Sequence, residues 1–428
     1  MMVMRSVLCD VLLLAAALAC CCCLAFQPPS TGVHKHGLLR PSSSASSSAA
    51  GSRRRQTGGL RMAISRPDPG KIMTLTRYML EQTRLYPEYQ DFESLMGSIQ
   101  LACKSIAMLV GSAGITGLVG AAGAVNVQGE DQKKLDVLSN DILKGALQYT
   151  GRCGVVASEE EPHPVLVEEA YMSKFVTVFD PLDGSSNVDA GIATGTIFGV
   201  FKEQEECMLP EQLDGDLMAN QCLGNTLQPG DNLVAAGYCM YSSSVHMVIT
   251  FGHGVQGFTL DPEIGEFVLT HPNMTLPRRG KIYSMNEGNS PDWPEGLRQY
   301  VDDVKQGKGA AGHKYSARYI GSMVGDVHRT LMYGGVFGYP ADKKNKNGKL
   351  RLLYEAAPMS FIVEQAGGKA STGYERIMDL HPKSVHDRTP IFLGSYDDVE
   401  EIEQYMAKHK EEIAPHLVAK EEQVPVAK

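Results

Sequence analysis

Apolar and polar residues follow the period of an α-helix in two stretches of the chain. The first begins after Asp91, a residue suited to cap a helix, and its apolar positions are Phe92, Leu95, Met96, Ile99, Cys103, Ile106 and Val110. This i, i+3, i+4, i+7 spacing predicts a long amphipathic helix. A second helix is predicted over about 131–149, with Asp136 on the face opposite to the apolar positions Leu135, Leu138, Ile142 and Ala146.

Short runs rich in β-branched and aromatic residues come next along the chain, and Gly, Pro and Asp separate them. They predict strands at 153–157, 175–179, 195–201, 233–240, 246–251, 256–260 and 265–269. Further along, strands are predicted at 281–284 and 336–339, and helices at 325–331 and 355–366. The alternation predicts a layered α/β (α+β) fold with two subdomains, 63–275 and 276–415, and a flexible tail at 416–428.

The first 62 residues have the pattern of a targeting leader. The unbroken apolar run 11–26 has 16 residues and comes after Arg5, which suits a signal peptide better than a membrane span of about 20 residues. Residues 27–62 are rich in Ser, Gly and Arg and contain no acidic residue, as transit peptides do. Together they resemble the bipartite leaders of plastids wrapped in extra membranes, which predicts the plastid stroma; the alternative is secretion.

Composition narrows the class of protein. The 428 residues, 43% apolar and 21% charged, suffice for two or three soluble globular domains and predict no stable membrane insertion. Acidic residues number 49 and basic residues 40, but the leader holds seven of the basic residues and one acidic residue. The rest of the chain is therefore strongly acidic, which argues against a nucleic-acid-binding protein.

Two predicted strands end on carboxylates. The strand at 154–158 is followed by Glu159, Glu160 and Glu161, and the strand at 175–179 is followed by DPLDGSSN (180–187). If the two strands are neighbours, their acids meet at one edge of a sheet. Carboxylate oxygens without Cys or His are the ligands that Mg²⁺ or Mn²⁺ selects.

The same stretch has groups that suit a phosphate. Gly184 to Asn187 offer backbone N–H groups and hydroxyls, and Pro181 stiffens the turn that carries Asp180 and Asp183. A metal pair that also binds a phosphate would assist an in-line attack by water. Either Glu160 or Asp136 could be the general base that activates this water.

The pairing of SEEE with DPLDGSSN resembles the lithium-sensitive, metal-dependent phosphatase superfamily. Six further blocks resemble the fructose-1,6-bisphosphatases within it: KKLDVLSND (133–141), GTIFGV (195–200), LVAAGY (233–238), GKIYSMNEG (280–288), ARYIGSMVGDVHRT (317–330) and NGKLRLLYE (347–355). The resemblance covers about residues 72–410. It implies a layered αβαβα sandwich that assembles as a homotetramer, with two or three Mg²⁺ per subunit and Mn²⁺ as a substitute. The implied reaction is hydrolysis of fructose 1,6-bisphosphate to fructose 6-phosphate, in plastid carbon fixation and gluconeogenic carbohydrate synthesis.

The resemblance also implies a role for individual residues. The metal ligands are Glu159, Asp180, the Leu182 carbonyl, Asp183 and Glu355, with Glu130 competing with Asp131 for a third metal. Glu160 and Asp136 activate water. The scissile phosphate is held by Asp183, Gly184, Ser185 and Ser186. The sugar and its distal phosphate are held by Asn286, Tyr319, Tyr339, Lys349 and Arg351, and Arg318 reaches the site of a neighbouring subunit.

The sequence departs from the family pattern at several of these positions. Asn289 stands where a tyrosine is expected near the distal phosphate. The loop that forms the AMP site in animal enzymes is replaced by YPEYQ (86–90), and Phe175 and Lys202 replace a tyrosine and an arginine there. Regulation by AMP is therefore not expected.

An acidic insertion at 203–227 resembles the redox loop of the chloroplast enzymes of this family. It contains Cys207 and Cys222, while Leu227 stands at the place of a third cysteine. The resemblance implies a disulfide that thioredoxin reduces; the alternative is two unpaired surface cysteines. Two other functions stay open at this point: hydrolysis of sedoheptulose 1,7-bisphosphate, and a catalytically inactive sugar-phosphate sensor.

Overall fold

The computed structural model describes residues 72–87, 90–118, 120–125, 131–148, 150, 153–166, 175–203 and 223–409. Within the chain, Arg66–Lys428 forms one compact unit. Several predicted features lie outside the described residues: the leader at 1–62, the tail at 416–428, the ligand candidate Glu130, and the cysteines Cys207 and Cys222.

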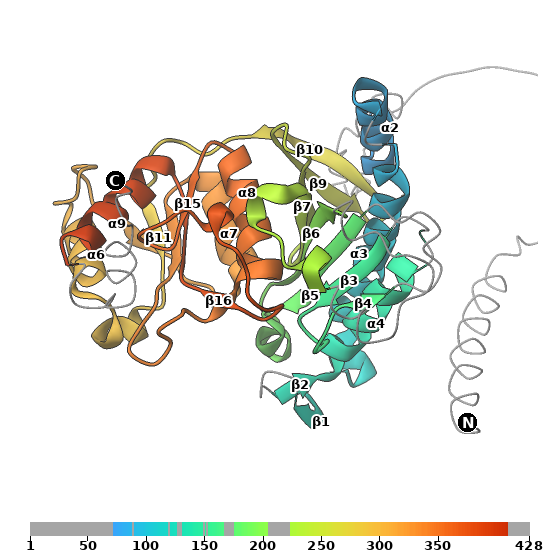
Figure 1. The fold of residues 1–428 in the computed structure, drawn as a ribbon, viewed down its shortest axis with the longest axis horizontal. Helices are drawn as coiled ribbons and strands as arrows, with labels where there is room; N and C mark the ends of the chain where they lie inside the picture. The colour runs from blue at the N-terminus through green and yellow to red at the C-terminus, as the bar shows by residue number, and fades with distance from the viewer. Residues whose placement is uncertain are drawn as a thin grey trace, which may run out of the picture. The chain divides into compact units, whose positions relative to one another are not determined.

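The larger sheet has eight strands in the order β10-β9-β8-β7-β6-β5-β3-β4 (Figure 1). They are β3 Cys153–Ser158, β4 Val165–Leu166, β5 Phe175–Asp183, β6 Thr194–Lys202, β7 Leu233–Tyr241, β8 Val245–Thr250, β9 Val255–Asp261 and β10 Glu266–Met274. The seven strands predicted between 153 and 269 are all confirmed. Every neighbouring pair is antiparallel except β3 and β5, which run parallel.

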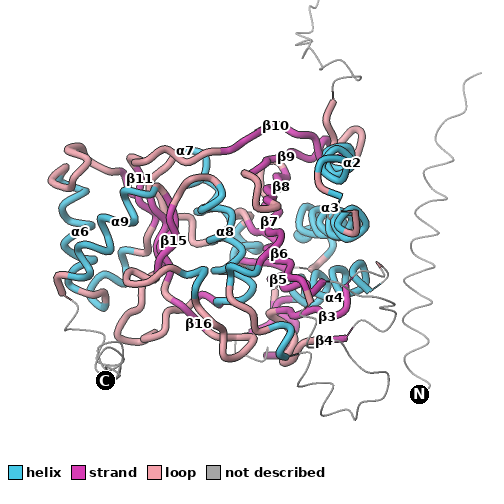
Figure 2. The backbone as a smooth tube through the Cα atoms, turned by 45° about the horizontal axis from the view of Figure 1, so that its top comes forward, coloured by secondary structure: helices cyan, strands magenta, loops and turns pink. Residues whose placement is uncertain are grey.

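Helices cover both faces of this sheet. Figure 2 shows α2 (Leu75–Leu85), α3 (Phe92–Thr116) and α4 (Lys134–Gln148) along one face. The opposite face is covered by α7 (Met323–Tyr333) and α8 (Ala357–Gln365), which contact β6 and β7. The apolar side chains between the sheet and these helices form two separate buried clusters.

A second sheet lies beyond α7 and α8 (Figure 1). Its five strands, in the order β12-β11-β13-β17-β15, are β11 Ile282–Ser284, β12 Ser316–Ala317, β13 Val336–Tyr339, β15 Lys369–Ser371 and β17 Ile391–Gly394. Helices α6 (Glu295–Gln306) and α9 (Tyr396–Ala407) form the outer layer. The result is the predicted αβαβα sandwich, and position 275 falls between the last strand of the first sheet and the first strand of the second.

Two short strand pairs lie outside these sheets. Strand β1 (Ala121–Val125) pairs with β2 (Asp131–Lys133), and β14 (Leu350–Arg351) pairs with β16 (Arg388–Thr389). A single turn of π-helix, Leu352–Ala356, connects β14 to α8. This connection carries one of the predicted metal ligands, Glu355.

Helix α3 confirms the first predicted helix. Nine of its residues are buried, beginning with Phe92, although the Asp91 side chain makes no capping hydrogen bond. Among the described residues it is the only helix long and apolar enough to cross a membrane, and here it contacts α4 and β7 as a core helix. Its outer side carries three exposed apolar side chains seven residues apart, Leu101, Met108 and Ile115.

The second predicted helix is confirmed as α4, and most of its predicted apolar face is confirmed too. Leu135, Ile142 and Ala146 pack in the core, whereas Leu138 is exposed. Asp136, placed on the opposite face by the sequence, is buried, as are Ser139 and Asn140. The reason is that α4 turns these polar side chains toward the carboxylate-bearing ends of β3 and β5, and periodicity alone assigns a polar residue to the exposed face.

Candidate active site

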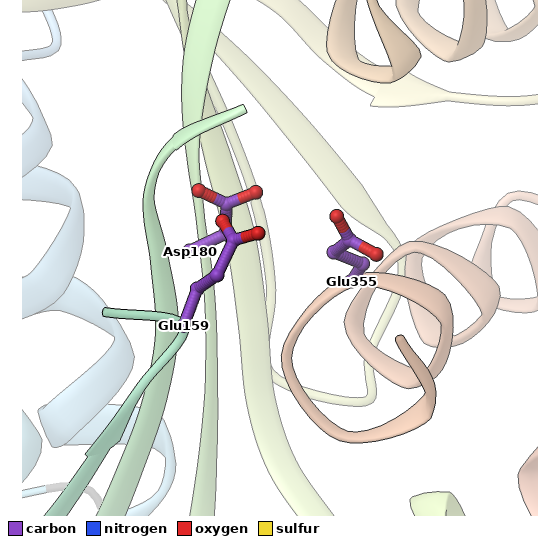
Figure 3. Close-up of side chains that lie close together, drawn as sticks. All are labelled: Glu159, Asp180 and Glu355. Carbon is purple, nitrogen blue, oxygen red and sulfur yellow. The ribbon is translucent and has the colours of Figure 1, made fainter. Parts of the chain in front are cut away.

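Three carboxylates from distant parts of the sequence converge at one end of the large sheet. Glu159, Asp180 and Glu355 each place one oxygen within 4.8 Å of the others. Figure 3 shows Glu159 and Asp180 side by side on adjacent strand ends, with Glu355 facing them from the turn before α8. Asp180 and Glu355 are buried, with exposed fractions of 1% and 3%.

The parallel pairing of β3 and β5 brings the first two carboxylates together. Ser158 is in register with Phe179, so the next residue of each strand is an acid. The Glu159 amide donates to the Phe179 carbonyl at 3.2 Å, which holds the turn against β5. This confirms the predicted meeting of two acid-bearing strand ends at one sheet edge.

Glu355 comes from the other side of the site. It lies in the π-helical turn 352–356, and its carboxylate accepts a hydrogen bond from the Arg351 backbone amide. On the opposite strand, the Leu182 amide donates to Asp180 Oδ1 at 2.9 Å, so backbone groups orient both carboxylates. The chain thus fixes these side chains before any ligand arrives.

One buried cation stands against the three acids. Arg351 Nη2 lies 3.3 Å from Glu159 Oε1, and only 4% of the Arg351 side chain is exposed. Burial, reinforced by Glu355, raises the pKa of Glu159 to about 8 although Arg351 opposes the shift. Burial, reinforced by Glu159 and Asp183, raises the pKa of Asp180 well above its usual range. A further positive charge would therefore stabilise the ionised cluster.

Asp183 sits on the same strand end, held by the N-terminus of α7. Its Oδ2 accepts from the Val324 amide at 2.9 Å and from the Ser322 hydroxyl at 3.4 Å. Burial and the nearby Glu355 raise the pKa of Asp183 to about 7. Sequence reasoning gave no role to Ser322 or Val324, although both lie in the block ARYIGSMVGDVHRT.

The turn after Asp183 leads into a short 3₁₀ helix, Ser185–Ala190. Gly184 has φ = 74°, and a Cβ there would lie 2.9 Å from the Ser322 hydroxyl, so both backbone and space require glycine. The Ser185 hydroxyl donates to Asp136 Oδ2 at 3.2 Å. Asp136 Oδ2 also accepts a hydrogen bond from the Lys133 amide at 2.9 Å. Lys133 directly precedes α4 and Asp136 lies in its first turn, so this is a capping hydrogen bond at the N-terminus of the helix.

Asp136 and Glu160, the two residues predicted to activate water, therefore differ in burial and in the element that carries them. Asp136 is buried on α4 beside the 3₁₀ helix, while Glu160 is half-buried in the turn after β3, next to Glu159. The Glu160 amide donates to the Ser158 hydroxyl at 3.3 Å. In the segment predicted to hold the scissile phosphate, Gly184 and Ser185 are half-buried and Ser186 is exposed, while Leu182 just before it is buried.

The residues predicted to hold the sugar and distal phosphate lie around the edge of the second sheet. Tyr339 is the last residue of β13. Partial burial, together with the nearby Tyr339 hydroxyl, raises the pKa of Tyr319 to about 12. Lys349 and Arg318 are exposed, and the Asn286 side chain accepts from the Gly288 amide at 3.2 Å. Arg351, predicted for the same role, instead has its guanidinium against Glu159.

The donor set fits a hard divalent cation. Three carboxylates with oxygens this close, shielded from solvent and opposed by one arginine, carry an excess of negative charge that Mg²⁺ or Mn²⁺ would compensate. Within the described residues, no other cluster of three such ligand side chains approaches this closely. The cluster therefore has the composition of a hard-metal site rather than of a zinc or iron site.

Comparisons with known proteins identify the family. Family models described as fructose-1-6-bisphosphatase match the chain at residues 73–272 (N-terminal domain) and 276–407 (C-terminal domain). A chloroplastic fructose-1,6-bisphosphatase of Brassica napus is 54% identical over 82% of this chain and 86% of its own. Its Arabidopsis thaliana counterpart, fructose-1,6-bisphosphatase 1, is 55% identical over 79% and 81%.

Solved structures agree with this result. The holo form of Leishmania major fructose-1,6-bisphosphatase is 42% identical, covers 78% of this chain and 99% of its own, and superposes with a TM-score of 0.73. The family depends on metal and is tetrameric. With both family models matched and more than half of the aligned residues identical in two relatives, the chain belongs to the fructose-1,6-bisphosphatase family.

Proposed function

We propose that this protein hydrolyses fructose 1,6-bisphosphate to fructose 6-phosphate and phosphate. The observation that carries the proposal is the convergence of Glu159, Asp180 and Glu355, in a chain of this family, at the end of the strand that leads into the turn at Gly184–Ser186. Every proposed metal ligand among the described residues retains an oxygen donor, which disfavours an inactive sensor.

The proposed metal is Mg²⁺, two or three ions per subunit. Glu159, Asp180, Asp183, Glu355 and the Leu182 carbonyl would hold it, with Glu130 as a candidate ligand for a third ion. When bound, such a metal supplies an activated water and neutralises charge on the phosphate. Arg351 then balances the residual charge on Glu159, at 3.3 Å.

The remaining groups act on the phosphates and the proton. Glu160 or Asp136 accepts the proton of the attacking water, and the Gly184–Ser186 amides and hydroxyls hold the scissile phosphate. At the far end of the substrate, Lys349, Tyr319, Tyr339 and Asn286 bind the sugar and distal phosphate. Lysine supplies charge there and tyrosine supplies hydroxyl donors.

Assembly is proposed to complete the site. Arg318 is exposed, and its Nη1 donates to the Ala317 carbonyl of the adjacent residue, which leaves the guanidinium at the surface within reach of a neighbouring subunit. The apolar stripe Leu101, Met108 and Ile115 on α3 is the kind of surface that a tetramer covers. We therefore propose a homotetramer with shared sites.

The chain is proposed to act in the plastid stroma, in carbon fixation and carbohydrate synthesis. The relatives named chloroplastic and the leader composition at 1–62 support this location. Thioredoxin is the proposed reductant of a disulfide between Cys207 and Cys222. The insertion that holds them follows Lys202, the last residue of β6. Lys202 pairs with Phe175 at the start of β5, and Ile197 and Gly195 of the same strand pair with Asp180 and Asp183.

The test is phosphate release by the purified mature chain. With fructose 1,6-bisphosphate and Mg²⁺ we expect turnover at the rates typical of enzymes, about 1 to 1,000 per second, and none in excess EDTA. Sedoheptulose 1,7-bisphosphate is assayed in parallel, and a higher kcat/KM for it would replace the proposed substrate. Absence of release from either bisphosphate, with folded protein and either Mg²⁺ or Mn²⁺, would overturn the proposal.

A further inference from the structure

The third acid of the SEEE motif anchors the turn that carries Glu159. The Glu161 carboxylate accepts from Asn140 Nδ2 at 2.9 Å and from Lys144 Nζ at 2.5 Å, both on α4. Asn140 Oδ1 accepts from the Ser158 hydroxyl at 2.7 Å, and Ser158 Oγ accepts from the Glu160 amide at 3.3 Å. Each donor in this chain of hydrogen bonds therefore has an acceptor, and α4 fixes the turn from one side.

His386 reaches the same turn from the other side of the site. Its Nε2 lies 3.0 Å from the Glu161 carbonyl, and its Nδ1 lies 2.9 Å from the Tyr354 hydroxyl. Tyr354 is fully buried and directly precedes Glu355 in the π-helical turn. One imidazole thus spans the segment bearing Glu159 and the segment bearing Glu355.

The two partners determine the tautomer of His386. A carbonyl oxygen can only accept, so Nε2 must carry a proton, and in the neutral ring Nδ1 is then the acceptor for the Tyr354 hydroxyl. Burial lowers the pKa of His386, which favours this neutral form. The neighbouring Asp387 carbonyl accepts from the Leu352 amide at 2.7 Å, so the backbone at 386–387 is itself tied to the start of the π-helical turn.

We propose that His386 is a positioning residue of the metal site: through Glu161 and Tyr354 it holds the Glu159-bearing turn and the Glu355-bearing turn at the separation that one divalent cation needs. This rests on the metal site of the proposed function. His386 acts on the distance between two ligands that arrive from segments almost 200 residues apart in the sequence. Its hydrogen bonds go to residues near the ligands in the sequence, and His386 itself takes up none of the ligand oxygens in these bonds.

The experiment measures Mn²⁺ binding to the full mature protein by calorimetry and by the electron paramagnetic resonance signal of free Mn²⁺. His386→Leu removes both hydrogen bonds, and Tyr354→Phe removes the hydroxyl while keeping the buried ring. Outer hydrogen-bond partners of metal ligands typically contribute about 10- to 100-fold to metal affinity, so we expect His386→Leu to weaken Mn²⁺ binding by that factor. His381→Gln, an exposed histidine five residues earlier, is the matched control and should bind like wild type.

Two readouts separate positioning from general stability. First, saturating Mn²⁺ should restore kcat in the variants, with KM for the bisphosphate unchanged. Second, His386→Gln should recover part of the Mn²⁺ affinity that His386→Leu loses, because the glutamine amide can still donate to the Glu161 carbonyl. In addition, Tyr354→Phe combined with His386→Leu should cost no more than His386→Leu alone, because both act through one link. If His386→Leu does not fold, the Mn²⁺ affinity of Tyr354→Phe alone tests the proposal.

The outcomes distinguish this proposal from the proposed function. Wild-type-like Mn²⁺ affinity in Tyr354→Phe and His386→Leu, with an active wild type, overturns the role of His386 alone. A wild type that binds no Mn²⁺ overturns both. Weakened Mn²⁺ binding in the variants of a wild type that releases no phosphate supports His386 and overturns the proposed reaction.

Discussion

Arg351 Nη2 lies 3.3 Å from Glu159 Oε1, with 4% and 14% of the two side chains exposed. This is one shielded cation beside three carboxylates that lie within 4.8 Å of one another. The arginine cannot balance all of them, because at most one acid is neutralised by one guanidinium. Protons or metal ions must supply the rest, and the two compete for the same oxygens.

The first prediction is that metal affinity rises with pH. Because burial and Glu355 raise the pKa of Glu159 to about 8 and the pKa of Asp183 to about 7 in the metal-free protein, a metal must displace protons in this range. We expect tighter Mg²⁺ binding at about pH 8.5 than at about pH 6.5, with protons released. Calorimetry in two buffers of different ionisation enthalpy measures both quantities; pH-independent affinity with no proton release would contradict the prediction.

The same titration sets the stability of the metal-free protein. In the unfolded chain the pKa of Glu159 returns to its ordinary value of 4.5, so between about pH 4.5 and 8 the folded state holds a proton that the unfolded state has lost. The free energy of unfolding should therefore fall as the pH rises through that window. Thermal unfolding in EDTA should show a lower Tm at about pH 8 than at about pH 6, and Mg²⁺ should reduce the difference.

The second prediction concerns Asp183, held by the Ser322 hydroxyl and the Val324 amide. Asp183→Ala should lower kcat at least about a thousandfold, several kcal/mol of barrier, because the residue is proposed to hold both metal and phosphate. Steady-state assays at saturating Mg²⁺ measure this. Asp302→Ala on the exposed side of α6 is the control, and near-normal turnover in Asp183→Ala would show that the site is misassigned.

Much of this site could be foreseen from the sequence, and the exceptions have a common cause. The strands at 153–157 and 175–179 were predictable from runs of apolar residues, and the acids from their position after each run, although β5 continues through Asp183 where the sequence suggested a turn. The roles of Glu161 and His386 were not, because each acts through a tertiary hydrogen bond to a segment more than 15 residues away. The burial of Asn140 on α4 was missed for the same reason, since hydrogen-bond partners and not its own apolarity bury it.

The third prediction concerns the distal phosphate. Lys349 is exposed just before β14, so Lys349→Ala should raise KM for fructose 1,6-bisphosphate more than it lowers kcat, since that phosphate is remote from the bond broken. Lys346→Ala, in the same turn and also exposed, is the control. A fall in kcat at unchanged KM would place Lys349 elsewhere.

The fourth prediction is that AMP leaves the enzyme nearly unaffected. A cavity of about 410 Å³ lies between α2 and α3, and its described lining, which includes Gln90 and Glu93, has no Lys or Arg to neutralise a nucleotide phosphate. Phe175, which stands at the position of a tyrosine, has no hydroxyl, and its ring is buried against Phe92 with ring centroids 4.4 Å apart. Activity is measured against AMP at concentrations that inhibit animal enzymes; cooperative inhibition would refute the prediction.

The fifth prediction is a thiol switch at Cys207 and Cys222. Closing the 14 residues between them would restrict the chain by about 3 kcal/mol in the entropic model. The restriction falls after the end of β6 that pairs with Phe175, in a strand whose other half pairs with Asp180 and Asp183. Oxidation should raise the Mg²⁺ requirement, and thioredoxin, with a potential of about −270 mV, should reverse it. Either cysteine replaced by Ser should give an enzyme fixed in the active state.

The switch is tested by measuring activity while the reduction potential of the solution is set with dithiol and disulfide mixtures. The control is Cys153→Ala, because burial raises the pKa of the Cys153 thiol to about 11 and makes it a poor nucleophile. The control should respond like wild type. Identical, flat responses of wild type, Cys207→Ser and Cys222→Ser would eliminate the switch.

The π-helical turn at Leu352–Ala356 constrains which changes the chain can accept. Each residue of a regular α-helix advances side chains by about 100°, so removing one residue here would let the turn join α8 smoothly and swing Glu355 away from Glu159 and Asp180. Such a deletion would give a more regular helix and an inactive enzyme. At this turn, therefore, the number of residues matters as much as the identity of Glu355, because one residue fewer would leave the carboxylate in the chain but aim it away from Glu159 and Asp180.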